Sequence, residues 1–176
     1  MGAVRFTKVD SPVGELLLAA SDKGLVSLLF EIWGHGPADE ERANWEQDDG
    51  TGPAGEILAE ARRQLLEYFS HQRTTFDLPL DLRGTPFQLQ VWNALTRIPF
   101  GSTLSYGDLA RRVGSANGSR AVGAANGKNP VAIVVPCHRV IGSNGDLTGF
   151  GGGMARKEWL LQHEGGITEE LFTKET

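Results

Sequence analysis

The chain is poor in cysteine and lacks long apolar runs. Cys137 is the only cysteine among 176 residues, which excludes an internal disulfide and any metal site built from several cysteines. No segment approaches the ~18 uninterrupted apolar residues of a membrane span, and the N-terminus lacks the apolar stretch of a signal peptide. We therefore expect a cytoplasmic protein of a reducing, intracellular compartment, with no membrane partner, no metal and no cofactor.

Positive charge is scarce in the first half of the chain and gathers in the second. The net charge is −5, yet residues 1–82 hold seven basic and fifteen acidic side chains while residues 83–176 hold ten and seven. Between positions 97 and 139, a single acid, Asp108, accompanies six basic residues: Arg97, Arg111, Arg112, Arg120, Lys128 and Arg139. This asymmetry suits a protein that presents one face to DNA, although an uneven solvated surface is the simpler explanation of the charges alone.

The first half of the chain predicts a small α/β unit. Three short apolar segments separated by turn sequences predict an antiparallel meander over residues 4–9, 15–20 and 25–30. The polar, acidic and glycine-rich residues 34–52 predict a loop. Apolar residues recur at helical spacing over 53–69, and residues 75–82 predict an extended segment.

The second half predicts helices, with a domain boundary at Arg83–Gly84 that separates units 1–83 and 84–176. Thr85-Pro86 with Gln88 has the pattern of a capped helix start, and this helix should end at residues 99–101. Ser105 can cap a helix over 106–113. A further helix over 118–127 follows, so that two short helices around a turn suggest a helix-turn-helix, although many helical hairpins bind nothing. The last helix is expected over 154–164, with Gly165 ending it.

The segment around Cys137 carries the main chemical signal. The five apolar residues 131–135 predict a buried strand that Pro136 ends, which places the thiol at the end of a buried segment. A free cysteine is often only a small buried hydrophobe, but the neighbouring His138 could act as a base. Neighbours on an extended segment point to opposite faces, so contact through a bridging water is the expected arrangement.

Two later segments predict turns and loops. Asn144-Gly145 suits a tight reverse turn, and the glycine-rich residues 149–153 permit close approach of the backbone to a ligand. No Gly-Lys-Ser/Thr follows, so a phosphate-binding loop is not indicated. We expect the tail beyond Gly166 to be mobile.

Several motifs in matching order resemble one family. The chain contains the run Pro136-Cys137-His138-Arg139-Val140, with Asn129-Pro130 upstream of it and Lys-Glu-Trp-Leu-Leu-Gln-His-Glu-Gly downstream at 157–165. Together these motifs make the chain resemble the O6-alkylguanine–DNA alkyltransferases, also called methylated-DNA–cysteine methyltransferases. The resemblance is close over residues 84–165 and extends to the first 83 in outline. It implies an α/β (α+β) fold class, with a ribonuclease H-like N-terminal domain and a mostly helical, winged-helix-like domain that contains the helix-turn-helix.

The resemblance also implies the activity and its partner. The activity is direct-reversal DNA repair, in which the alkyl group of O6-alkylguanine, and of O4-alkylthymine, moves irreversibly from duplex DNA to Cys137. One protein molecule would repair one base, as a monomer that could assemble cooperatively on DNA. The protein would bind the minor groove and rotate the damaged base out of the helix.

The family's site residues fall on positions of this chain. The catalytic group would be Cys137 as nucleophile, His138 as base, Glu164 as the residue that holds the imidazole, and Asn129 as a hinge. Contacts with DNA or the damaged base would come from Tyr106, Arg120, Ala121, Asn126, Val140, Phe150 and Gly151. Tyr106 would crowd the phosphate beside the lesion, and Arg120 would fill the vacated stack. Some relatives have tyrosine and serine at the last two positions, which could alter the bulky adducts that fit.

Plainer interpretations of the same residues stay open. From its position alone, Glu164 is a solvated acid at a helix end, Asn129 a helix stop, Tyr106 a half-buried helix residue and Arg120 a surface charge. Two other functions are also compatible with the residues: a non-catalytic lesion-binding or regulatory helix-turn-helix protein, and a cysteine hydrolase that turns over.

Overall fold

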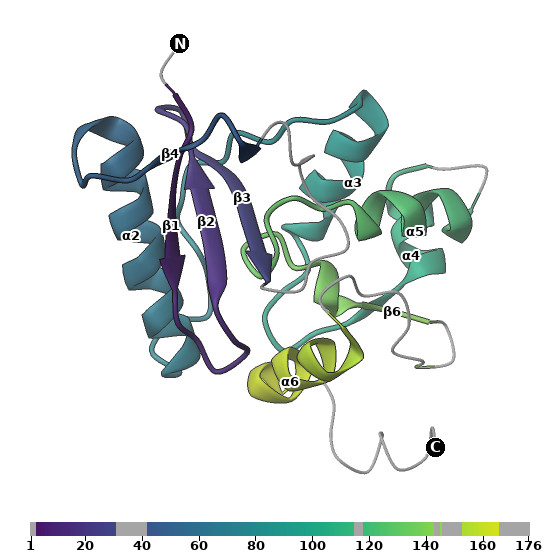
Figure 1. The fold of residues 1–176 in the computed structure, drawn as a ribbon. Helices are drawn as coiled ribbons and strands as arrows, with labels where there is room; N and C mark the ends of the chain where they lie inside the picture. Colours follow the sequence, from purple (N-terminus) through teal and green to yellow (C-terminus); the bar gives the residue numbers. More distant parts are fainter. Residues whose placement is uncertain (1–2, 31–41, 115–117, 143–144, 146–152, 166–176) are drawn as a thin grey trace. The chain divides into compact units, whose positions relative to one another are not determined.

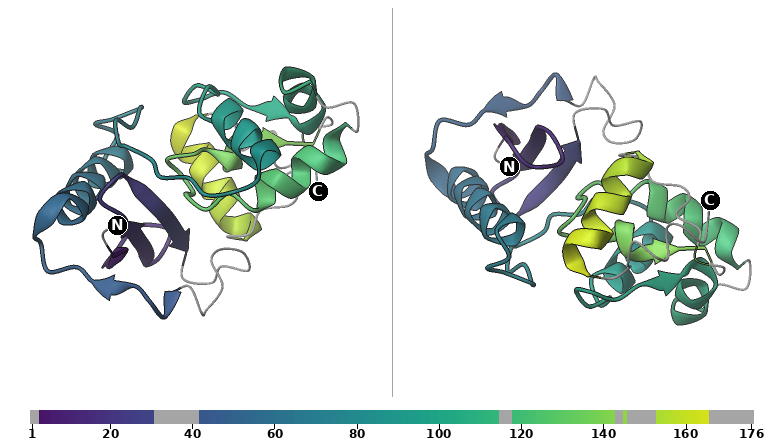
Figure 2. Two further views of the ribbon diagram at one scale, coloured as in Figure 1. Left: turned by 90° about the horizontal axis from the view of Figure 1, so that it is seen from above. Right: turned by 90° about the horizontal axis from the view of Figure 1, so that it is seen from below.

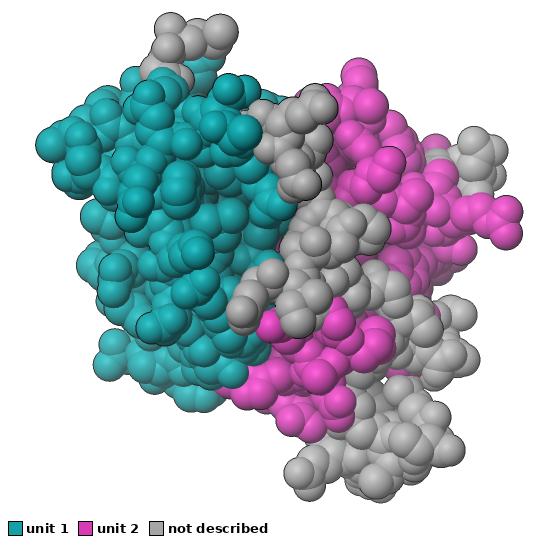
Figure 3. Space-filling view, in the orientation of Figure 1, with its two compact units in different colours: residues 1–83 teal, residues 84–176 magenta. Residues whose placement is uncertain are grey.

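The computed structural model describes residues 3–30, 42–114, 118–142, 145 and 153–165 (Figure 1). The chain divides into two compact units, residues 1–83 and 84–176 (Figure 3). The first holds most of the strands and the second most of the helices, so the fold is mixed α/β with a small N-terminal sheet and a helical C-terminal unit.

The sheet of the first unit is built on the expected meander. Strands β1 (Arg5–Val9), β2 (Leu16–Ala20) and β3 (Leu25–Phe30) pair antiparallel, with Val9 opposite Leu16 and Leu16 opposite Phe30. Both connections are tight turns, closed by a 3.0 Å bond from Gly14 N to Ser11 O and another from Ser21 N to Gly24 O. Strand β3 is buried along its whole length.

A fourth strand lies where the sequence predicted only loop. The two exposed residues of β4 (Glu46–Gln47) pair parallel with β1, giving the strand order β3-β2-β1-β4. Backbone carbonyls in β1 and just before it provide the partners: Glu46 N donates to Val4 O and Asp48 N to Phe6 O, each at 2.9 Å. The loop prediction was wrong here because main-chain pairing at a sheet edge needs no apolar pattern in the side chains.

One helix covers a face of this sheet. Helix α2 (Gly52–Phe69) packs on β1 and β2 (Figures 1 and 2). Its inner face buries Leu58, Leu65 and Tyr68 almost completely, as the helical spacing of these residues indicated. The segment after α2 runs back along the unit, and Leu80 forms an isolated bridge with Leu25 of β3.

The second unit contains a three-helix cluster. Helix α3 (Pro86–Leu95) begins with the predicted capping box, in which Thr85 and Gln88 exchange backbone and side-chain hydrogen bonds, but it ends at Leu95 rather than at residues 99–101. Helix α4 (Tyr106–Arg112) and helix α5 (Ser119–Gly127) pack against each other and against α3.

The expected buried strand over residues 131–135 is not formed. The segment is a buried, tightly coiled turn, with Val135 N bonded to Val131 O at 3.0 Å and Ile133 at a φ of 69°. Burial of the apolar run was predicted correctly; only its backbone conformation was not. A short apolar run does not distinguish a strand from other buried segments.

Beyond the turn over residues 131–135, the chain forms three more elements. A 3₁₀ turn, η1 (Cys137–Arg139), leads into β6 (Val140–Ile141), which pairs parallel with β5 (Leu104–Ser105). Helix α6 (Met154–Glu164) has the predicted bounds, and Gly165 ends it in the left-handed conformation at a φ of 73°. Asn144, the glycine-rich segment up to 152 and the tail beyond 165 lie outside the described residues.

Candidate active site

The only thiol of the chain sits at the start of η1, nearly closed off from solvent. Cys137 is 3% exposed, and its backbone N donates to Val135 O at 2.8 Å. Burial raises the pKa of the Cys137 thiol, and Asn129 and the Lys157 ammonium oppose this rise. The nucleophile therefore depends on its neighbours to become a thiolate, which is the reactive form of cysteine.

Asn129 closes the turn that delivers Cys137. Its Nδ2 donates to Val135 O at 2.7 Å, and its Oδ1 accepts from Val131 N at 3.1 Å. The side chain is fully buried, so its two hydrogen bonds replace backbone pairing for a segment that forms no strand. Asn129 thus fixes the turn over residues 131–135 that leads to Cys137. Its role is more than that of a residue that ends the preceding helix.

His138 and Glu164 form a buried pair. The imidazole Nε2 lies 2.9 Å from the Glu164 Oε2, and both side chains are fully buried. Burial lowers the pKa of His138 even though Glu164 opposes the change. Burial would raise the pKa of Glu164, but His138 and Arg139 outweigh it and hold the pKa well below its usual range. The solvated-acid interpretation of Glu164 is therefore wrong: the carboxylate is buried and ionised.

The second ring nitrogen of His138 faces a different environment. Nδ1 is buried and has no hydrogen-bond partner among the described residues. Cys137 and His138 are successive residues of a 3₁₀ turn, so they do not alternate across a strand as the sequence suggested. The site therefore has the three parts of a nucleophile–base–orienter arrangement. These are a thiol, an imidazole with one nitrogen free of hydrogen bonds among the described residues, and a carboxylate that orients the imidazole.

Arg139 does not belong to the exposed basic patch in which the sequence placed it. It is 6% exposed, and its Nε and Nη2 donate to the two carboxylate oxygens of Glu164 at 2.7 and 3.0 Å. Its Nη1 donates to Ile98 O at 2.6 Å. The other five basic residues of that stretch, Arg97, Arg111, Arg112, Arg120 and Lys128, are exposed. Charge alone does not separate Arg139 from these five, although it directly follows the buried segment that ends at Cys137 and His138.

Lys157 is a site residue that sequence reasoning missed. It is fully buried, its Nζ donates to Val140 O at 2.6 Å, and the same atom lies 5.9 Å from the centroid of the Tyr106 ring. Burial lowers the pKa of Lys157 to about 8, and the charge of Cys137 opposes this change. A signal was present: Lys157 shares the spacing i, i+3, i+4, i+7 with Leu160, Leu161 and Glu164, which marks it as part of the buried face of α6.

Tyr106 and Asn126 lie near the nucleophile from α4 and α5. Tyr106, the first residue of α4, is partly exposed, and burial and the charge of Cys137 raise the pKa of its phenol. Asn126 is buried, and its Nδ2 donates to Cys137 O at a long 3.4 Å. Val140, a residue expected to contact DNA or the damaged base, is also buried, and its carbonyl accepts from Lys157.

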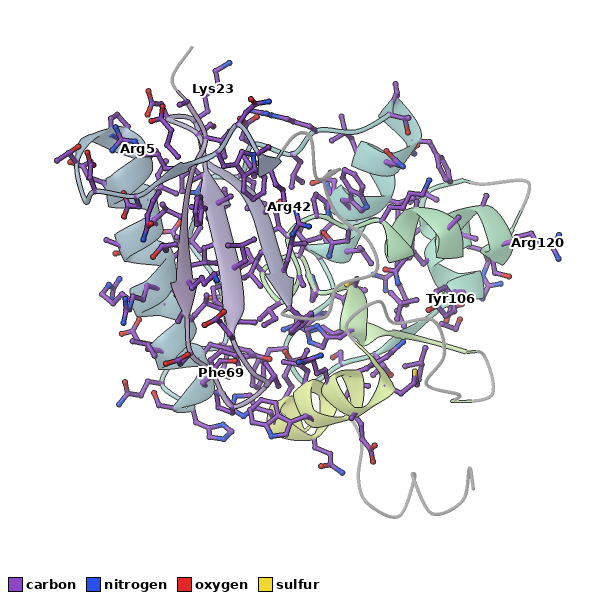
Figure 4. All side chains as sticks on the ribbon, viewed as in Figure 1. Arg5, Lys23, Arg42, Phe69, Tyr106 and Arg120 are labelled. Atoms are coloured by element: carbon purple, nitrogen blue, oxygen red, sulfur yellow. The ribbon has the colours of Figure 1, made fainter. Side chains whose placement is uncertain are left out.

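Two further expected residues lie at the start of α5. Arg120 is exposed near the start of α5 and points outward from the helix (Figure 4). Ala121 follows it and is partly exposed. Phe150 and Gly151 lie outside the described residues, so their expected contacts stay predictions.

Neither a metal-binding cluster nor a membrane-spanning helix is found in the described part of the chain. It contains no group of three or more His, Cys, Asp or Glu side chains placed to hold a metal ion. It also contains no helix whose length and apolar character would let it cross a membrane.

Both halves of the chain match models of one family. Residues 4–82 match the ribonuclease-like domain of 6-O-methylguanine DNA methyltransferase, and residues 86–166 match its DNA binding domain. A methylated-DNA–protein-cysteine methyltransferase of Mycolicibacterium paratuberculosis is 47% identical over 161 residues, 92% of each chain. The constitutive enzyme of that name from Bacillus subtilis is 43% identical over 162 residues, 90% of this chain and 94% of its own. Mycobacterium tuberculosis OGT, solved in complex with DNA, superposes with a TM-score of 0.82 at 46% identity and covers 91% of this chain and 92% of its own.

Proposed function

The chain belongs to the 6-O-methylguanine DNA methyltransferase family, and we propose that it repairs O6-alkylguanine in DNA by moving the alkyl group onto Cys137. It is a methylated-DNA–protein-cysteine methyltransferase by the same relationship. The observation that carries the residue assignment is the position of the lone, buried thiol directly before the buried His138–Glu164 pair.

The transfer is a substitution at the alkyl carbon. The thiol proton of Cys137 passes to Nδ1 of His138, through a water molecule, and the resulting imidazolium is stabilised by Glu164. The thiolate sulfur attacks the alkyl carbon in line, a carbon–sulfur bond forms, the carbon–O6 bond breaks, and its electron pair stays on the guanine base. The base then takes up one proton to become neutral guanine, and the imidazolium gives up the proton that it took from the thiol, so that the alkyl group and one proton have exchanged places. Nδ1 suits this role because it is buried and has no hydrogen-bond partner in the described part of the chain.

The reaction ends with the first transfer. The product is a thioether, whose sulfur carries no ionisable proton and has lost the nucleophilicity of a thiolate. One chain would therefore repair one base and then remain alkylated. The same chemistry would act on O4-alkylthymine, where the alkyl group is likewise bonded to an exocyclic oxygen.

The DNA would be held by the helical unit. Helices α4 and α5 carry exposed Arg111, Arg112 and Arg120, which suits contacts with phosphates. A base inside a duplex must leave the stack to reach a buried thiol, so we assign the outward-pointing Arg120 to the vacated position and Tyr106 to the phosphate beside it. The small residues of α5 would permit close approach to the minor groove, and Ala121 would lie along that surface. Asn126 is buried beside Cys137, so it would contact the damaged base rather than the groove.

The protein would act as a monomer in the cytoplasm, with possible cooperation between copies only along one DNA duplex. The N-terminal unit would support the helical one. Support for the DNA partner comes from the 46%-identical OGT that was solved with DNA.

One experiment separates the proposal from its alternatives. The protein is mixed with an equimolar duplex carrying O6-methylguanine, and its intact mass is measured, followed by peptide mapping. We expect a gain of one methyl group on the peptide with Cys137, a restored guanine, and a stop at one equivalent. Tight lesion binding with unchanged mass would overturn the proposal in favour of a binding protein. Release of product beyond one equivalent would overturn it in favour of a hydrolase.

The matched control replaces only the nucleophilic atom. Cys137→Ser keeps the size of the side chain, so binding to the lesion should persist while methyl transfer is lost. A methyl group found on the serine variant would place the acceptor elsewhere.

A further inference from the structure

The buried carboxylate of Glu164 has two cationic or potentially cationic partners. His138 Nε2 and Arg139 Nη2 share its Oε2 at 2.9 and 3.0 Å, and Arg139 Nε occupies its Oε1 at 2.7 Å. The arginine contact is bidentate and charge-assisted, the strongest kind of hydrogen-bonded pair. Arginine is permanently charged, whereas histidine is charged only when protonated.

The arginine is itself held in place by the backbone. Its Nη1 donates at 2.6 Å to the carbonyl of Ile98, which follows α3. Helix α3 packs against η1 and carries no Lys, Arg, Asp or Glu. The charged groups that act on His138 are therefore Arg139 on its own turn and Glu164 and Lys157 on α6, with the Cys137 thiol beside it.

The state of the carboxylate decides which nitrogen of His138 carries the proton. An ionised carboxylate only accepts hydrogen bonds, so Nε2 must donate to it, and in a neutral imidazole Nδ1 then holds the lone pair. A protonated Glu164 would instead donate to Nε2, leaving the hydrogen on Nδ1. In that tautomer His138 could not take a proton from Cys137.

We propose that Arg139 is a positioning residue that supplies the permanent counter-charge of Glu164, and thereby holds His138 neutral with its lone pair on Nδ1. The benefit of this role for alkyl transfer rests on the proposed function. The predicted tautomer and charge of His138 are properties of the protein without DNA and can be measured separately. Without Arg139, the buried carboxylate could be neutralised only by a proton, taken up by His138 or by Glu164 itself. Either outcome removes the acceptor that the thiol needs.

The direction of the electrostatic effect agrees with this role. After burial and the opposing effect of Glu164, the charges of Arg139 and Lys157 further lower the pKa of His138. Loss of the Arg139 charge should therefore raise the pH at which His138 gains its proton. The rising limb of the pH–rate profile should shift the same way, because it reports that protonation.

The test compares Arg139→Gln and Arg139→Lys in the full-length protein. Nitrogen NMR of labelled histidine reports the tautomer and protonation of His138 between about pH 5 and 8, the range in which histidine usually titrates. We expect the wild type to be neutral with its proton on Nε2. Arg139→Gln should raise the titration midpoint by about one pH unit or more, as expected for the loss of a close charge. Arg139→Lys, which keeps the charge, should restore the midpoint even if it lowers the thermal stability.

A control and a kinetic measurement separate this role from a merely structural one. Arg62→Gln removes the same charge from an exposed position on α2 and should leave His138 unchanged. Methyl transfer, normalised to the fraction of protein that reacts, should level off at higher pH in Arg139→Gln than in the wild type or Arg139→Lys. A structural role alone would lower the reacting fraction and leave the profile in place.

The outcomes distinguish failure of this inference from failure of the proposed function. An unchanged tautomer and midpoint in a folded Arg139→Gln variant would overturn the inference, whatever the activity. If that variant does not fold, failure of Arg139→Lys to keep the wild-type midpoint would overturn it as well. A wild-type protein that transfers no methyl group would overturn the proposed function while leaving the NMR result on Arg139 standing.

Discussion

The replacement Glu164→Gln should destabilise the helical unit strongly although it changes the shape of the side chain little. The amide keeps one acceptor oxygen but turns the other position into a donor, which faces the donors of His138 or Arg139. Arg139 then remains buried with its charge unpaired. Breaking a buried ion pair by removing one partner costs about 3–5 kcal/mol, a large share of the roughly 5–15 kcal/mol that stabilises a typical protein.

The assay is urea denaturation at neutral pH, followed by tryptophan fluorescence, since Trp92 and Trp159 both lie in the unit concerned. The matched control is Glu158→Gln, which removes a carboxylate from a partly exposed position of the same helix. A surface change of this kind usually alters stability by less than about 0.5 kcal/mol. The double replacement Arg139→Met with Glu164→Leu removes both charges and should recover much of the loss, because no unpaired charge stays buried.

A loss below about 1 kcal/mol in Glu164→Gln would refute this reasoning, since that is the range of exposed ion pairs. It would mean that water reaches Arg139 or that the guanidinium finds another acceptor. A double variant less stable than Glu164→Gln would also refute it, by showing that packing rather than charge dominates at this position.

Three further predictions concern Asn129, Lys157 and the exposed Arg112. Asn129→Ala should lower the unfolding free energy by about 1–3 kcal/mol, because it leaves buried backbone groups unsatisfied, and it should slow alkyl transfer. Urea denaturation measures the first effect and single-turnover kinetics the second, and an unchanged transfer rate would contradict the hinge role. Lys157→Met should raise the pKa of Cys137, since the ammonium lowers it, and ultraviolet absorbance of the thiolate during a pH titration would detect the shift; an equal or lower midpoint would contradict it. Arg112→Gln should weaken binding to undamaged duplex and reduce the slope of log affinity against log salt by about 1, whereas an unchanged slope would remove Arg112 from the DNA-binding surface.

The stability of the wild type should also depend on pH through Lys157. Burial lowers its pKa from 10.5 to about 8, so between these values the unfolded chain binds the proton and the folded chain does not. Stability contributed by this group therefore rises with pH across that window. The difference between wild type and Lys157→Met in urea denaturation isolates this contribution, and a difference that stayed constant from about pH 8 to 10 would contradict it.

Much of the local structure was readable from short sequence signals. The capping box at Thr85 and Gln88, the serine cap of α4 and the glycine after α6 were found where predicted, because each depends on residues within one turn of the helix. The bounds of β3 and α6 also matched the predicted ranges. The turn over residues 131–135 was mistaken for a strand, because its conformation depends on the side chain of Asn129 rather than on the apolar run itself.

The sequence by itself determined the N-terminal meander, the starts of the helices and the family, and it singled out Cys137 as the candidate nucleophile, since these follow from residue types in order along the chain. Tertiary structure alone decided which charges are buried. Arg139 and Arg120 are chemically identical in the sequence, yet one is enclosed against Glu164 and the other is exposed. Burial depends on packing between elements distant in the chain, here η1, α6 and the backbone after α3. That packing buries Lys157, Arg139 and Glu164, and their charges form the electrostatic environment of Cys137 and His138.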